Sequence, residues 1–126
     1  MRGRLAALAV LCWPAAALAQ PEASEAFAER QDDLVTLASH LGGLHRLHQV
    51  CHPEEEPDRF RRNLMAIIPL EVPKGSTRLD MIAAFNGGYR AAASAHVICG
   101  REARKAYAQE AEAALAVTER LYAPFR

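Results

Sequence analysis

Three histidines stand at helical spacing in the middle of the chain. His45, His48 and His52 are separated by three and then four residues, which places them on one side of a helix. Imidazole nitrogens suit zinc and copper, so the set could bind a transition metal. The competing interpretation is that His45 and His48, which fall on an apolar face, are core histidines with hydrogen-bond partners. His52 precedes Pro53 and is expected just past the helix end.

A second polar set lies on the apolar face of a later predicted helix. Asn86, Tyr89 and Arg90 are its members, and His45 is expected opposite them on the first helix. Because an unpaired buried polar group costs about 1–3 kcal/mol, these side chains need partners. They either form an internal hydrogen-bond network that fixes helix register, or line a cleft for a small anion or a peptide carboxylate. In the cleft, Arg90 is the charge anchor.

Arrangements for catalysis are not evident in the sequence. No serine has a nucleophile-elbow context, and there is no phosphate-binding loop, zinc-hydrolase motif or dinucleotide fingerprint. The carboxylates nearest to structured segments, Glu71, Asp80 and Glu110, show no paired spacing. We therefore predict no catalytic residue and favour a protein that is not an enzyme. The only cofactor to consider is the zinc or copper that the histidines could hold.

The first 19 residues are typical of a secretory signal peptide. Arg2 and Arg4 form a basic start, residues 5–18 are apolar, and Ala17-Leu18-Ala19 is a small-x-small cleavage site. The alternative is an uncleaved membrane anchor, which the length disfavours because a spanning helix needs about 20 residues. We expect cleavage after Ala19, export to the periplasm or beyond, and no transmembrane segment in the mature chain.

Two cysteines remain after this cleavage, because Cys12 leaves with the signal peptide. Cys51 and Cys99 form an even pair in an oxidising compartment, which predicts a disulfide bond between them. It would close a loop of about 49 residues and contribute about 4 kcal/mol in the chain-entropy model. A redox or metal-binding pair is the alternative, but the sequence has no Cys-x-x-Cys spacing to support it.

Helical periodicity dominates the rest of the chain. Apolar residues recur every three or four positions, Ala, Leu, Glu and Arg are frequent, and no stretch alternates like a strand. We expect an all-α protein, a small four-helix bundle, in a single helical domain over residues 29–126. Residues 20–28 are expected to be a flexible arm or the start of the first helix. The helices are predicted at about 29–51, 57–68, 77–98 and 101–121.

Two features of this bundle stay open, and the place of the third helix within it is predicted. Gly42-Gly43 inside the first helix either permits a close helix–helix approach or marks a bend. The third helix is expected to be central and buried on two sides, with Leu79 and Val97 on its main apolar face. Gly100 permits a break after it, but the third and fourth helices could also form one rod.

The stretch Ala84-Phe85-Asn86-x-Gly88-Tyr89-Arg90 and the cysteines Cys51 and Cys99 are the most specific part of a resemblance to a family of small exported bacterial proteins known only as a domain of unknown function. The resemblance covers about residues 33–120, and it implies a fold and a compartment but no activity. The sequence departs from the family at Phe60, where the family has a Trp-Arg pair, and at Gly87, where it has a basic residue. The matching stretches are Leu41-Gly42-x-Leu44-His45-x-Leu47-x-x-x-Cys51, Asp58-x-Phe60-Arg61 with Met65, Glu71-x-Pro73, Ala84-Phe85-Asn86-x-Gly88-Tyr89-Arg90, and Cys99.

Length and charge limit the class of protein further. The chain has 126 residues, which is one domain, and 15 basic residues balance 15 acidic ones. A dedicated nucleic-acid binder usually has a basic excess, so no nucleic-acid partner is expected. We expect an exported, disulfide-stabilised binding module for another protein or an envelope component, with a metal binder and a small-anion or peptide-end binder as the alternatives.

Overall fold

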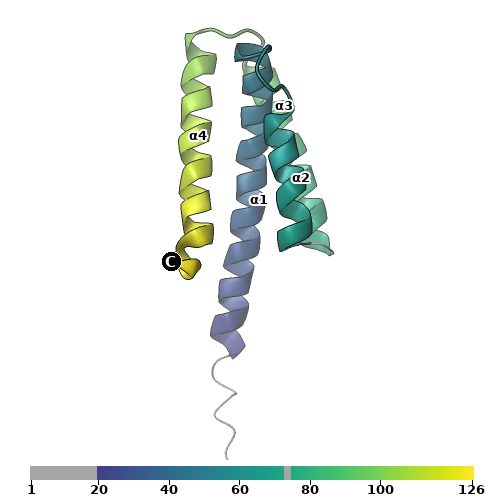
Figure 1. Ribbon diagram of the computed structural model, residues 1–126, viewed down its shortest axis with the longest axis vertical. Coiled ribbons are helices and arrows are strands. Elements are labelled where there is room, and N and C mark those ends of the chain that lie inside the picture. Colours follow the sequence, from purple (N-terminus) through teal and green to yellow (C-terminus); the bar gives the residue numbers. More distant parts are fainter. Residues whose placement is uncertain (1–19, 73–74) are drawn as a thin grey trace, which may run out of the picture.

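The protein is an all-α bundle, as the sequence predicts. The computed structural model describes residues 20–72 and 75–126. Four α-helices follow one another, with a short 3₁₀ turn, η2 (Ala123–Phe125), at the end (Figure 1). No strand occurs among the described residues. The helices are α1 (Gln20–Cys51), α2 (Arg59–Glu71), α3 (Ser76–Ala95) and α4 (Arg101–Tyr122).

The central helix is α1, not the third helix as expected. α1 packs against each of the other three, and its buried leucines and alanine supply much of the core. In α3 only Met81, Phe85 and Ala92 are buried, whereas Leu79 is 67% exposed and Val97, beyond the helix end, is 75% exposed. The reason is that α1 has apolar residues around a wide face, so it can serve three neighbours. The buried apolar residues of this α1 face are Leu34, Leu37, Ala38, Leu41, Leu44 and Leu47.

Glycines set the close contact between α1 and α3. A Cβ atom on Gly42 would stand 1.9 Å from the backbone oxygen of Phe85, a separation that real side chains do not reach. Gly42 of the glycine pair therefore permits a close approach, and the pair lies within a continuous helix. The missing Cβ lets the two backbones meet, which offsets the roughly 1 kcal/mol that glycine costs inside a helix.

Three predicted helix boundaries are wrong. α1 begins at Gln20 and not near Glu29, so residues 20–28 continue the first helix. α2 continues past residue 68, its predicted end, through Pro69 and ends at Glu71. Because Pro69 lies in the last turn, its ring and missing N–H disturb only one backbone hydrogen bond. α3 ends at Ala95, three residues earlier than expected, and the extended backbone of His96 separates it from α4.

The predicted signal peptide, residues 1–19, lies outside the described residues. Within residues 20–72 and 75–126, no helix is long and apolar enough to cross a membrane. The two ends of the bundle differ in what they hold. One end, here the disulfide end, contains Cys51 and Cys99; the other, the open end, is formed by the start of α1, the end of α2, the start of α3 and the end of α4 with η2 (Figure 1).

Candidate functional site

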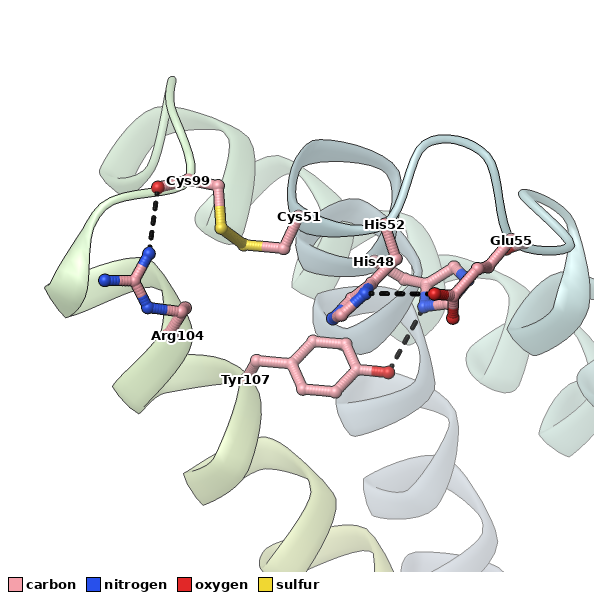
Figure 2. Close-up of a disulfide and its surroundings, with 7 residues drawn as sticks. All are labelled: His48, Cys51, His52, Glu55, Cys99, Arg104 and Tyr107. Atoms are coloured by element: carbon pink, nitrogen blue, oxygen red, sulfur yellow. Dashed lines mark hydrogen bonds and ion pairs between the residues drawn. A yellow bond between two sulfur atoms is a disulfide. The ribbon is translucent and has the colours of Figure 1, made fainter.

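A disulfide bond closes one end of the bundle. The Sγ atoms of Cys51 and Cys99 are bonded, and their Cα atoms are 4.9 Å apart. The bond joins the last residue of α1 to the segment between α3 and α4. Because α3 ends at Ala95, Cys99 lies in this segment, where it can reach Cys51. Arg104, in the first turn of α4, donates a hydrogen bond of 3.3 Å to the Cys99 carbonyl (Figure 2). The staple predicted from the sequence thus ties α1 to the α3–α4 connection.

His48 lies beside this bond in a saturated hydrogen-bond network. Its Nε2 donates to the backbone carbonyl of Glu55, so the neutral ring accepts at Nδ1, where the Tyr107 hydroxyl donates over 3.2 Å (Figure 2). The His52 ring stacks on the His48 ring at a centroid distance of 5.4 Å, and Phe60 meets it edge-on. Burial raises the pKa of Tyr107 above its ordinary value of 10.0. Nε2 of His48 therefore anchors the loop after α1, while Nδ1 links α1 to Tyr107 of α4.

His45 turns toward a different neighbour. Its ring packs on Phe85 and Tyr89 of α3 at centroid distances of 5.5 and 5.7 Å. Gln49 bridges the two polar side chains, because it accepts a 3.0 Å bond from the Tyr89 hydroxyl and donates a 3.3 Å bond to Nε2 of His45. The proton of the neutral ring then sits on Nδ1, which is buried without a partner in the described structure. Burial has the largest effect on the pKa of His45 and lowers it. The charge of Asp58 acts to raise this pKa, whereas Arg61 and His48 lower it further.

The predicted polar set is only partly assembled. His45 and Tyr89 come together, but through Gln49, a residue that the sequence analysis did not single out. Gln49 stands four residues after His45, on the same helix face, and this spacing was the available signal. Asn86 and Arg90 are exposed, and neither joins the hydrogen bonds of this cluster.

The three histidines do not converge on a common point. His45 faces α3, whereas His48 and His52 stack near Tyr107 of α4. Within the described ranges, no group of three or more His, Cys, Asp or Glu side chains is arranged to hold a metal ion. The helical spacing is as predicted, but the side chains diverge because α1 has neighbours on several sides.

An apolar pocket at the open end was not anticipated. It has a volume of about 210 Å³ and lies between α1, α2 and α4 with η2. At its rim the Arg30 guanidinium donates to the Leu121 carbonyl (2.8 Å) and to the Glu71 carboxylate (2.7 Å), and lies 5.4 Å from the Phe125 ring centroid. Its apolar lining consists of Leu34, Leu37, Ile67, Leu70, Leu121, Tyr122 and Phe125.

Exposed apolar side chains gather at this end of the bundle: Leu70, Tyr122 and Phe125 line the pocket, and Phe27 of α1 lines a neighbouring hollow. Leu70 is 84% exposed, Phe125 74%, Phe27 66% and Tyr122 61%. Singly, such residues are ordinary, but a contiguous apolar patch with a polar rim is typical of an interaction site. The open end is therefore the part of the described molecule best suited to hold an apolar group. Sequence patterning could not find it, because the four residues come from four different elements.

The fold and these contacts define a small, disulfide-stapled helical protein. The chain belongs to the family described as "Protein of unknown function (DUF2385)", whose model matches residues 30–125. This confirms the resemblance to a domain-of-unknown-function family. No curated protein and no solved structure matches the chain.

Proposed function

We propose that this protein is an exported, non-enzymatic interaction module that binds another protein or an envelope component at its open end. The observation that carries the proposal is the group of exposed apolar side chains at this end: Leu70, Tyr122 and Phe125 line the end pocket, and Phe27 lines a second hollow that shares Phe125 with it. Burying such surface on a partner is favourable by about 25 cal/mol per Å². The predicted signal peptide and the disulfide, which is typical of oxidising compartments, support export.

Export is tested by the mass and location of the native protein. The expected product begins at Gln20, is found outside the cytoplasm, and is lighter than its reduced form by two hydrogens. Intact-mass measurement of fractionated cells, with thiols blocked at lysis, checks all three. A full-length chain in the cytoplasm with both thiols free would contradict export.

Binding is tested with two matched double variants. Leu70→Ser with Phe125→Ser removes apolar surface from the open end, whereas Val97→Ser with Ile98→Ser removes similarly exposed surface from the disulfide end, where both residues are about three-quarters exposed. All four side chains lie outside the core, so both variants should fold. A partner captured from envelope extract under non-reducing conditions should be lost with the first variant and kept with the second. Equal capture by both variants would refute the open end as the site.

A further inference from the structure

α1 extends beyond the other helices at the open end (Figure 1). Its residues 22–29 are all exposed. The face that α1 buries nevertheless continues into this extension, because Ala23 and Phe27 precede Arg30, Leu34, Leu37 and Leu41 at spacings of four and three. In the bundle this face is buried against neighbouring helices, whereas in the extension none of the described residues covers it.

A second hollow connects the extension to the end pocket. It has a volume of about 370 Å³ and lies between the start of α1 and the end of α4 with η2. Arg30, Leu121 and Phe125 line both hollows, while Phe27 and Glu29 line only this one. Because they share these residues, the two hollows adjoin each other, and the path from Phe27 to Leu70 along them suits a segment with apolar side chains on one face.

The charge beside this path is negative. Glu22, Glu25, Glu29 and Asp32 are exposed, and none forms an ion pair with another residue in the described part of the chain. The nearby arginines are already engaged, since Arg30, Arg120 and Arg126 pair with Glu71, Asp33 and Glu119 respectively. The surplus carboxylates of α1 therefore lack compensation from these arginines.

We infer that the open end binds a cationic amphipathic helix. Its apolar face would lie along the path between Phe27 and Leu70, and flanking Lys or Arg side chains would meet the carboxylates of α1. This is helix-in-groove recognition, with charge setting the choice of partner. A second copy docked through its own open end, or an anionic lipid surface, would bring more negative charge to the same carboxylates. The inference rests on the proposed function, because it names the chemistry of the partner at the same site.

Two synthetic peptides test the inference on the full mature protein. Both are labelled amphipathic peptides of about 15 residues, near the length at which an isolated helix becomes stable in water. One combines Leu with Lys, and the other combines Leu with Glu in the same apolar pattern. Fluorescence anisotropy should show the Leu/Lys peptide binding at least about tenfold more tightly, with an affinity that falls as salt rises.

Variants locate this binding on the protein. Leu70→Ser with Phe125→Ser should weaken the Leu/Lys peptide at least about tenfold, whereas Val97→Ser with Ile98→Ser should not. Glu22→Gln, Glu25→Gln and Glu29→Gln together should reduce the preference for Lys over Glu. The control triple, Glu54→Gln, Glu102→Gln and Glu112→Gln, carries the same change in charge elsewhere and should keep the preference. Circular dichroism verifies that each variant is folded.

Several outcomes would overturn the inference. Equal affinity for the two peptides would do so, as would equal loss with the two triple variants. Sedimentation that shows a dimer abolished by the Leu70 and Phe125 changes would make a second copy the occupant. If partner capture depends on Leu70 and Phe125 while the peptides show no preference, the proposed function stands and the inference fails. If capture shows no such dependence, the proposed function itself fails.

Discussion

Gly88 of α3 lies directly against the backbone of Ser39 in α1. A Cβ atom on Gly88 would stand 2.0 Å from the Ser39 carbonyl oxygen, which no side chain tolerates. The neighbouring Gly87 has open space at the corresponding position. Adjacent glycines of one helix thus have opposite roles, because one is a contact between backbones and the other faces away from any neighbour.

This contrast predicts opposite effects of the same substitution. Gly88→Ala should destabilise the protein by about 1–3 kcal/mol or more, because the neighbouring atoms are backbone and can move only with their helix. Gly87→Ala should stabilise it by up to about 1 kcal/mol, since alanine is the better helix former. Urea unfolding of the two variants checks both signs. Similar loss in both variants would disprove the close α1–α3 contact.

Acid should weaken the fold through His45. Burial lowers the pKa of His45 below 6.5, so in acid the unfolded chain takes up a proton before the folded chain does. The free energy of unfolding should therefore fall as pH drops through about 6.5, and this contribution should end below the folded pKa. The slope from one such group is at most about 1.4 kcal/mol per pH unit.

The variant His45→Phe isolates this contribution. Phenylalanine keeps a ring against Phe85 and Tyr89 but does not titrate, so its stability should depend less on pH between about 7.5 and 5. Comparing urea unfolding of variant and parent at both pH values removes the constant cost of the substitution. Parallel pH profiles would show that His45 is not protonated on unfolding.

Loop breakers and apolar spacing were sufficient to predict four helices and their order. Proline and glycine mark the turns, as at Pro57 and Gly100, and the apolar repeat marks the buried faces. The sequence left residues 20–28 open between a flexible arm and the start of the first helix, because Ala23 and Phe27 alone make only a weak apolar stripe. Extending an existing helix carries no nucleation cost, so the alanines and glutamates of residues 20–28 are sufficient to continue α1.

The candidate sites were harder to predict, for a geometric reason. A helical wheel gives the angle of a side chain but not which neighbour it meets or how closely. The contact at Gly88 centres α1 on the Phe85 side of α3, which buries His45 against Tyr89 and leaves Asn86 and Arg90 outside. The end pocket depends on where three chain segments end together, and spacing within one segment does not contain this information.

Breaking the disulfide should cost much of the stability. Cys51 and Cys99 are 48 positions apart, and in the chain-entropy model such a cross-link contributes about 4 kcal/mol. The double variant Cys51→Ser with Cys99→Ser should lower the free energy of unfolding by up to that amount. Protein that is reduced and then alkylated serves as the comparison. An unchanged denaturation midpoint would mean that the bond adds nothing to the bundle.

Removing one hydroxyl should test the network beside the disulfide. Tyr107→Phe keeps the ring against His48 and Phe60 but leaves Nδ1 of buried His48 without its 3.2 Å donor. The expected cost is about 1–3 kcal/mol, since an orphaned buried acceptor loses its bond to water as well. The control, Tyr122→Phe, removes a hydroxyl from a ring that is 61% exposed and should stay within about 0.5 kcal/mol of the parent.

Alkaline pH gives the same network a second test. Burial raises the pKa of Tyr107 above 10.0, so as pH rises through that value the unfolded chain loses its phenolic proton first. The folded state then binds more protons than the unfolded state, and stability falls with rising pH. Tyr107→Phe should reduce this alkaline loss, whereas Tyr122→Phe should retain it. If the two variants lose stability alike above about pH 10, burial does not raise the pKa of the Tyr107 hydroxyl in the folded protein.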